Sequence, residues 1–425
     1  MLIQFSVKNW RSVRDEQTLT MVKAKGVELG EANSFNPEVS SVGELLRTAV
    51  IYGANAAGKT NLISALRAMK DIVLDSAKAQ PGDELPLTPF LLDEETEDKP
   101  SEFEVFFVAK GIKFQYGFSA TKKQIFEEWL IAYPNARPQR WFSRVWDEAT
   151  GDFDWSFGAA FLGQKQTWVE STRPNALFLS TATQLNSQQL KPVLGWFKVT
   201  LRLGRVSGWS PSYTASLCEK EESRGKILAF LKAADLDIKE IDIKAELASL
   251  KHFPDSFPEE MKKQMLENMK DTQIYNIKTI HEGKQGQSIE FDFENESDGT
   301  KKLFSFAGPW LDVLSKGRVL LVDELHDNLH PKLVSFLVGL FHSKETNPNN
   351  AQLIFTTHET SILNQDVFRR DQIWFCEKDR DQATRLYPLS DFSPRKGRED
   401  LEAAYLAGRY GALPYVRAIK AMEFN

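Results

Sequence analysis

The segment from residue 47 to residue 73 constrains the fold more than any other part of the chain. An apolar run at 47–52 is followed by the loop Gly53-Ala-Asn-Ala-Ala-Gly58-Lys59-Thr60, and apolar residues then recur at helical spacing from 62 to 73. The loop matches the pattern G-x-x-x-x-G-K-[ST], which stands between a strand and a helix. This order predicts an α/β fold of the P-loop type.

The loop carries the residue types that phosphate binding requires. Gly53 and Gly58 let backbone N–H groups curl around phosphate oxygens, and the start of the following helix adds its positive dipole. Lys59 supplies a positive charge, and the Thr60 hydroxyl is suited to ligate Mg²⁺. We therefore predict a site for ATP and Mg²⁺. The predicted set of nucleotide-binding residues is completed by Asn55 and Asn61.

Two adjacent carboxylates end a second apolar strand, at residues 319–322. Asp323 is predicted to hold Mg²⁺ through water, and Glu324 to orient and deprotonate the attacking water. An apolar strand followed by acidic residues is common, so the alternative that both side chains only cap the next segment stays open at this stage.

Two weaker patterns flank this acidic pair. Ser297 and Gly299 stand just before a predicted helix at 300–314, where they could form a second phosphate-binding surface or an ordinary helix cap. His358 follows a predicted buried strand at 352–356, where it could sense a γ-phosphate or serve only the structure. Each pattern is weak alone, and only the order of all four elements favours the functional interpretation.

In that order, the four elements resemble the ABC-type ATPase heads, in particular the SMC-like branch with recombination and chromosome-maintenance ATPases and the OLD family. The opening segment 5–12, Phe-Ser-Val-Lys-Asn-Trp-Arg-Ser, matches the usual start of that branch. Segments 325–331 and 400–414 look like compact AAA-family ATP-binding proteins of bacterial anti-phage islands. The ATPases of the PARIS (AriA) and AbiL-type abortive-infection modules are examples.

The resemblance implies a nucleotide-gated homodimer or larger homo-oligomer. In ABC heads the signature loop reaches across the dimer, so Ser297 and Gly299 would contact the γ-phosphate held by the partner's Lys59. The usual Leu-Ser-Gly-Gly-Gln is Glu-Ser-Asp-Gly-Thr here, which keeps the serine and one glycine. The resemblance also implies a sensor or scaffold that controls a separate toxic effector protein, for which a nuclease is one candidate.

The resulting fold class is an α/β P-loop NTPase of the ABC-ATPase head type with a mixed sheet. An antiparallel β meander, at about 103–157, and a helical lobe are predicted between the P-loop and the signature. We expect four regions: an N-terminal part of the head at 1–170, a helical lobe at 171–285, a C-terminal part of the head at 286–392 and a tail at 393–425. Trp196, Phe197 and Trp209 are candidates for a protein interface.

Two alternative functions remain open, a DNA-repair or chromosome-type ATPase and an OLD-type nuclease component. The formal charge of −6, from 53 basic and 59 acidic residues, argues against a surface coated with basic side chains. The tail 393–425 has six basic and four acidic residues. Such a small excess of positive charge usually belongs to a solvent-exposed surface and not to a DNA-binding site. A nuclease would need a metal site such as Glu377, Asp379 and Asp381, but an acidic turn after a strand is the plainer interpretation.

The composition also bears on the compartment. The chain has two cysteines, Cys218 and Cys376, which lack the spacing of a disulfide framework or a cysteine zinc site. Neither a signal peptide nor an apolar run of 18 residues is evident. We therefore expect a cytoplasmic protein that does not enter the membrane.

Overall fold

The computed structural model describes residues 1–204, 209–253, 256–269, 272–394 and 399–415 of the 425-residue chain. The chain divides into two compact units. The first comprises Met1–Gly204, Leu314–Asp327 and Val334–Asn425, and the second comprises Arg205–Val313 and Asn328–Leu333. The P-loop, the acidic pair and His358 therefore belong to the first unit.

The first unit contains a six-stranded mixed sheet in the order β11-β15-β16-β5-β17-β18. All neighbours pair in parallel except β17 and β18, which are antiparallel. The central strands β5, β15 and β16 are buried at every residue, as expected for parallel strands covered on both faces. The strands are β5 (Thr48–Tyr52), β11 (Leu201–Leu203), β15 (Val319–Val322), β16 (Gln352–Thr356), β17 (Ile373–Lys378) and β18 (Thr384–Pro388).

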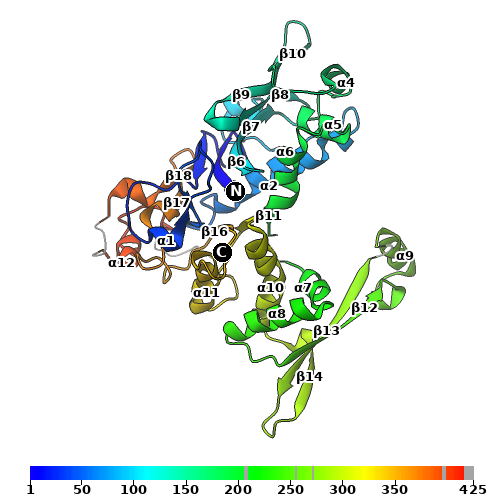
Figure 1. The fold of residues 1–425 in the computed structure, drawn as a ribbon, viewed down its shortest axis with the longest axis vertical. Helices are drawn as coiled ribbons and strands as arrows, with labels where there is room; N and C mark the ends of the chain where they lie inside the picture. The colour runs from blue at the N-terminus through cyan, green and yellow to red at the C-terminus, as the bar shows by residue number, and fades with distance from the viewer. Residues whose placement is uncertain (205–208, 254–255, 270–271, 395–398, 416–425) are drawn as a thin grey trace, which may run out of the picture. The chain divides into compact units, whose positions relative to one another are not determined.

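The first unit also contains a seven-stranded antiparallel sheet in the order β10-β9-β8-β7-β6-β1-β2. The predicted meander is confirmed as five consecutive strands, and the first two strands of the chain extend it at β6. Figure 1 shows helix α2 (Lys59–Asp75) beside β6. The strands are β1 (Leu2–Lys8), β2 (Gln17–Thr20), β6 (Ser101–Ala109), β7 (Ile112–Ala120), β8 (Ile125–Tyr133), β9 (Gln139–Asp147) and β10 (Asp152–Phe157).

One apolar core joins the two sheets through α2 and the helical segment after the meander. Trp196 and Phe197 are almost fully buried in this core and pack on Phe107, with ring centroids 4.4 and 5.9 Å away. The prediction that these two residues form a protein interface is therefore wrong, because the antiparallel sheet already covers them. Trp209 lies in the second unit and packs on Phe306 and Trp310.

A buried ion pair fastens the antiparallel sheet to α5 (Phe178–Gln184). Glu128 of β8 lies 2.9 Å from Arg144 of β9, and neither side chain is exposed. The Glu128 carboxylate also accepts hydrogen bonds from the Tyr116 hydroxyl at 3.0 Å and from the backbone N–H groups of Phe178 and Leu179 at 2.7 and 3.0 Å. Burial lowers the pKa of Arg144, with Glu128 opposing that shift.

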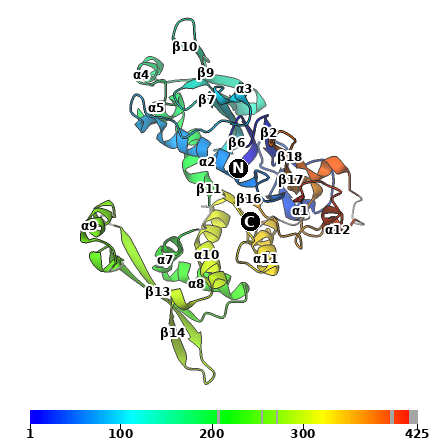
Figure 2. The same cartoon turned by 180° about the vertical axis from the view of Figure 1, so that it is seen from behind.

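The second unit combines helices with a three-stranded antiparallel sheet, β12-β13-β14. Figure 2 shows the sheet next to α7 and α8, with the β13–β14 hairpin extending beyond them. Cys218 lies buried at the end of α7. The elements are α7 (Pro211–Cys218), α8 (Glu221–Ala233), β12 (Glu240–Leu247), α9 (Glu259–Asn268), β13 (Gln273–Glu282), β14 (Ser288–Asp292) and most of α10 (Asp298–Lys316).

The observed units differ from the predicted regions. Residues 171–204 belong to the first unit, because α5 and the segment after it supply core side chains such as Phe178 and Trp196. Residues 286–313 belong to the second unit, and that unit contains a β-sheet as well as helices. Part of the predicted tail, at 395–398 and 416–425, lies outside the described residues, including Arg395, Lys396, Arg398, Arg417 and Lys420.

Shorter elements complete the fold. Among the described residues no helix is long and apolar enough to cross a bilayer. The remaining elements are α1 (Gly30–Asn33), β3 (Ser34–Phe35), β4 (Leu45–Leu46), α3 (Glu94–Glu97), α4 (Lys165–Glu170), α6 (Lys191–Gly195) with the π-helix Trp196–Thr200, α11 (Pro331–His342), α12 (Leu401–Leu406), and 3₁₀ turns at Ser76–Lys78, Pro134–Ala136, Leu250–His252, Phe293–Asn295, Arg370–Gln372 and Leu389–Phe392.

Candidate nucleotide site

The P-loop runs from the end of β5 to the start of α2, as its sequence predicts. Gly58 has φ +110°, and a Cβ atom there would lie 2.1 Å from Thr384 Oγ1. A Cβ atom on Gly53 would lie 2.2 Å from the carbonyl oxygen of Cys376. Both positions therefore need glycine, because the two ends of the P-loop are packed closely against β17 and β18.

The Lys59 side chain is held inside the loop. It is 4% exposed, and its ammonium group donates hydrogen bonds to the carbonyl oxygens of Gly53 at 2.9 Å and Ala54 at 3.2 Å. Glu324 Oε1 lies 3.8 Å from Lys59 Nζ. The loop residues Asn55 and Thr60 are exposed, so both side chains are accessible to a ligand.

The acidic pair follows β15 and contacts the neighbouring strand β16 through one hydroxyl group. Thr356 Oγ1 donates to Asp323 Oδ1 at 2.6 Å and accepts a hydrogen bond from the backbone N–H of Glu324 at 2.8 Å. The second carboxylate oxygen, Asp323 Oδ2, is buried without a hydrogen-bond partner. A buried carboxylate oxygen of this kind fits Mg²⁺, which prefers oxygen ligands and retains water.

His358 lies beside the predicted general base. Its Nδ1 atom is 3.2 Å from Glu324 Oε2, and the side chain is 52% exposed. A second histidine, His326, places Nε2 at 2.7 Å from His358 Nε2 and at 3.5 Å from Glu324 Oε2. The first unit therefore brings Lys59, Glu324 and His358 close together, and His326 lies beside them.

Ser297 and Gly299 belong to the second unit. The Ser297 hydroxyl accepts a hydrogen bond from the backbone N–H of Thr300 at 3.1 Å and so caps the N-terminus of α10. Ser297 is exposed and α10 has 19 residues. Ser297 therefore forms the N-cap that was one of the two interpretations of this segment. Its exposed side chain also lies at the N-terminus of a long helix, where the helix dipole is positive.

Three hydroxyl and amide side chains, which the sequence did not predict to interact, form hydrogen bonds beside the P-loop. The Ser12 hydroxyl lies 2.8 Å from Thr384 Oγ1 and accepts a hydrogen bond from Asn61 Nδ2 at 2.7 Å. Thr384 in turn donates to the carbonyl oxygen of Ala57 at 3.0 Å. Asn61, predicted to bind nucleotide, is therefore engaged in holding the opening segment of the chain. The Asn-Trp-Arg-Ser pattern at 9–12 was the only sequence signal for this contact.

Cys376 also lies under the loop. Its thiol donates a hydrogen bond to the carbonyl oxygen of Ala57 at 3.3 Å. Burial raises the pKa of the Cys376 thiol to about 12, although the nearby Lys59 charge opposes the shift. The thiol therefore remains protonated and serves the packing of the loop.

Of the three acids at 377–381, Glu377 lies in β17, and Asp379 and Asp381 lie in the turn between β17 and β18. Asp379 Oδ1 accepts hydrogen bonds from the backbone N–H groups of Asp381 and Ala383, both at 2.9 Å. Arg14 forms ion pairs with Asp379 at 3.6 Å and Asp381 at 3.0 Å. Asp379 and Asp381 thus form the acidic turn that the sequence analysis gave as the alternative to a nuclease metal site.

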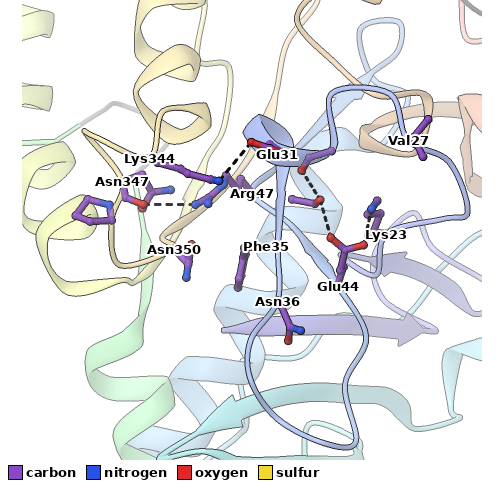
Figure 3. Close-up of a pocket in the computed structure, with 13 residues that line it drawn as sticks. Lys23, Val27, Glu31, Phe35, Asn36, Glu44, Arg47, Lys344, Asn347 and Asn350 are labelled. Atoms are coloured by element: carbon purple, nitrogen blue, oxygen red, sulfur yellow. Dashed lines mark hydrogen bonds and ion pairs between the residues drawn. The ribbon is translucent and has the colours of Figure 1, made fainter.

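A separate cavity of about 700 Å³ lies before β5, at the opposite end of the strand from the P-loop (Figure 3). Arg47, buried at its wall, donates to the carbonyl oxygen of Asn347 at 3.4 Å. Lys344 forms an ion pair with Glu31 at 3.6 Å. The cavity shares no residue with the nucleotide site.

Several solved structures are similar to this chain at low identity. The SMC head domain from Thermotoga maritima is 11% identical with a TM-score of 0.40, over 91% of this chain and 98% of that one. The Smc head domain with an extended coiled coil bound to ScpA, from Pyrococcus furiosus, is 15% identical with a TM-score of 0.37, over 91% and 96%. The recombination mediator protein RecF is 12% identical with a TM-score of 0.36, over 91% and 98%.

No curated protein matches the chain in sequence. A family model does match, over residues 49–364, and this range includes the P-loop, the acidic pair and His358. The family is described as "AAA domain, putative AbiEii toxin, Type IV TA system". With its parallel strands, P-loop and acidic pair, the first unit has the α/β P-loop NTPase fold of an ABC-type ATPase head. Because the match covers well over half of the chain, the protein belongs to this AAA family.

Proposed function

We propose that this protein binds ATP together with Mg²⁺ and hydrolyses the terminal phosphate. The observation that carries the proposal is the convergence on one edge of the sheet of Lys59, the Asp323–Glu324 pair and His358. These side chains come from three different strands or their following loops. Their arrangement supports a role in a single reaction at the P-loop.

Each residue has a role suited to its surroundings. Lys59 exchanges its bonds to the loop carbonyls for bonds to phosphate oxygens, and the N–H groups at the start of α2 bind the same phosphates. Thr60 and Asp323 hold Mg²⁺, which neutralises charge on the phosphates when bound. Glu324 accepts the proton of the attacking water, and His358 donates a hydrogen bond to the γ-phosphate.

We further propose that ATP joins two copies of the chain, with Ser297 and Gly299 of each copy contacting the nucleotide of the other. The exposed Ser297 at the N-terminus of the 19-residue helix α10 supports this role, because such a helix end attracts phosphate. A larger homo-oligomer built on the same contact is the related possibility.

The family description supports a role in controlling toxicity. We propose that the nucleotide-bound assembly acts as a cytoplasmic sensor or scaffold that restrains a separate effector protein in abortive infection, for which a nuclease is one candidate. Nuclease activity of this chain itself is not part of the proposal, since Asp379 and Asp381 are engaged in a turn with Arg14.

The test compares Glu324→Gln with Lys59→Ala. With ATP and Mg²⁺, Glu324→Gln should bind nucleotide, hydrolyse it at least about a hundredfold more slowly, and accumulate as a dimer or larger species measured by light scattering. Lys59→Ala should neither bind ATP nor assemble. Glu345→Gln, at an exposed carboxylate outside the site, is the matched control. Equal masses with and without ATP would contradict the assembly, and unchanged hydrolysis in Glu324→Gln would contradict the assigned base.

The biological part has its own test. Cells that carry the chain with its neighbouring genes are challenged with phage, and plaques are counted for the wild type and for Lys59→Ala. Protection should disappear with Lys59→Ala if ATP controls the effector. Full protection by the variant would rule out ATP control.

A further inference from the structure

We infer that Glu324, His326 and His358 form a binding site for a transition-metal ion of the Zn²⁺ type, distinct from the Mg²⁺ site at Thr60 and Asp323. One ligand atom from each of the three residues lies within 4.8 Å of the others. Two imidazoles and one carboxylate are a common zinc ligand set, and they leave a fourth position for water.

The spacing of the donor atoms fits a small tetrahedral ion. Ligands about 2.0–2.1 Å from zinc stand about 3.3 Å apart in a tetrahedron. Glu324 Oε2 lies 3.2 Å from His358 Nδ1 and 3.5 Å from His326 Nε2, which is close to that separation. With Nδ1 as the ligand atom of His358, its other ring nitrogen, Nε2, lies 2.7 Å from His326 Nε2, so one imidazole must rotate to admit the ion.

The protonation of the cluster also favours a metal. Two ring nitrogens at 2.7 Å cannot both carry a proton, so at least one of them presents a lone pair. Glu324 Oε2 is buried and makes no hydrogen bond, although it lies near both rings. A carboxylate oxygen and at least one imidazole lone pair therefore lie side by side, where a cation would be attracted to both.

A further contact orients His326. Its Nδ1 atom lies 3.0 Å from Thr357 Oγ1, on the side of the ring opposite the cluster. When Nδ1–H donates to this hydroxyl, Nε2 is left unprotonated and directed at Glu324 and His358. Histidine ligands of metals usually have such a partner on the other nitrogen.

The ligand types separate the two metals. Imidazole nitrogen suits Zn²⁺, whereas Mg²⁺ demands oxygen ligands. Asp323 and Thr60 offer only oxygen. We therefore expect a large excess of Mg²⁺ to leave the histidine site available to zinc.

The consequence for catalysis rests on the proposed function. A carboxylate that ligates zinc can no longer take a proton from water, and a ligating His358 can no longer contact a phosphate. Zinc at this site would therefore inhibit ATP hydrolysis, while Lys59 and the P-loop would remain able to bind nucleotide.

The experiment measures metal binding directly, without nucleotide. Zn²⁺ is titrated into the full chain in excess Mg²⁺ by calorimetry, and Co²⁺ is used as an absorbing substitute that reports tetrahedral coordination. We expect about one high-affinity ion per chain. His326→Ala should abolish this binding, and Thr357→Val should weaken it by about 10–100-fold. His330→Ala, at a histidine outside the cluster, should bind as the wild type does.

Hydrolysis provides the second readout. Zinc should lower the hydrolysis rates of the wild type and of His330→Ala. The rate of His326→Ala, compared with and without zinc in that same variant, should not change on addition of zinc. Absence of a high-affinity zinc ion in the wild type, or equal zinc affinity in His326→Ala, would overturn the inference. A chain that binds zinc but lacks ATPase activity would instead contradict the proposed function and leave the metal site standing.

Discussion

The Thr356 hydroxyl donates a hydrogen bond to Asp323 Oδ1 at 2.6 Å and also accepts one from the Glu324 N–H at 2.8 Å. This single group fixes the carboxylate that is proposed to hold Mg²⁺ and the backbone of the proposed general base. Thr356→Val keeps the shape of the side chain but removes both bonds. We expect ATP hydrolysis to fall by about 10–100-fold, with a higher Mg²⁺ concentration needed for half-maximal rate.

Thr356→Ser is the matched control because it retains the hydroxyl group. Its rate should stay near that of the wild type. If Thr356→Val hydrolyses ATP normally across a Mg²⁺ titration, the hydroxyl does not position the metal ligand.

Gly58→Ala should weaken ATP binding by about tenfold or more. Alanine there would have to hold φ near +110° with its Cβ 2.1 Å from Thr384 Oγ1, so the loop and the start of α2 must move. Gly82→Ala is the control, since Gly82 has φ +91° but nothing within 4 Å of an added Cβ. The control variant tests backbone strain alone, and its nucleotide affinity, measured by calorimetry, should be unchanged.

Glu128→Gln should destabilise the first unit by about 3–5 kcal/mol, because it leaves the Arg144 charge buried without its partner. Chemical denaturation followed by circular dichroism measures the effect. Glu127→Gln, at the exposed neighbour on the same strand, should change the free energy of unfolding by no more than about 0.5 kcal/mol. Similar stability of the two variants would show that the pair contributes little.

Combining Glu128→Leu with Arg144→Met provides a further check. Removing both charges should recover much of the stability lost in Glu128→Gln, since no unpaired charge is left in the core.

His342 should make the protein less stable in mild acid. Burial, followed by the charge of Arg47, lowers the pKa of His342 from 6.5 to about 3. The folded state therefore keeps this histidine neutral below pH 6.5, while the unfolded chain takes up a proton. The contribution of neutral His342 to the free energy of unfolding is complete above pH 6.5. This contribution is lost as the pH falls toward 3, by at most about 1.4 kcal/mol per pH unit.

His342→Gln removes this titration and can keep the contact with the Thr48 hydroxyl, which His342 makes at 2.8 Å. Unfolding free energies measured from pH 7 to 5 should decline less steeply in the variant than in the wild type. His330→Gln, at an exposed histidine, should follow the wild type. Parallel curves for all three proteins would show that His342 does not cause the pH dependence.

The parts of the fold that could be predicted from the sequence are those with strong local patterns. The strands at 319–322 and 352–356 are found at the predicted residues, because fully buried parallel strands are continuous apolar runs. The P-loop was predictable because Gly53 and Gly58 have positive φ angles and close backbone contacts that other residues cannot adopt, so a local sequence pattern marks the loop. In contrast, β12 (Glu240–Leu247) was missed, although its charged and apolar residues alternate strictly, as in a strand with one polar face; it lies between charged segments with helical patterns and is mostly exposed.

Within the candidate site, the unpredicted residues are those that depend on strand order. Val322 pairs with Phe355 in the parallel register of β15 and β16, so Asp323 comes to lie beside Thr356. No local pattern reveals this neighbour, because many strand orders are compatible with the same apolar runs. The same limit applies to His326, which meets His358 only because their strands are adjacent.

The packing of Cys376 beneath the P-loop has a practical consequence. Cys376 and Cys218 are the two cysteines of the chain, both are buried, and burial raises their thiol pKa values to about 12 and about 11. Maleimides and iodoacetamides react with accessible thiolates, so they should leave the native protein unlabelled. Fluorophores or spin labels could thus be attached at a pair of introduced surface cysteines without first removing the natural ones. The wild-type chain is therefore a suitable background for distance measurements during nucleotide turnover.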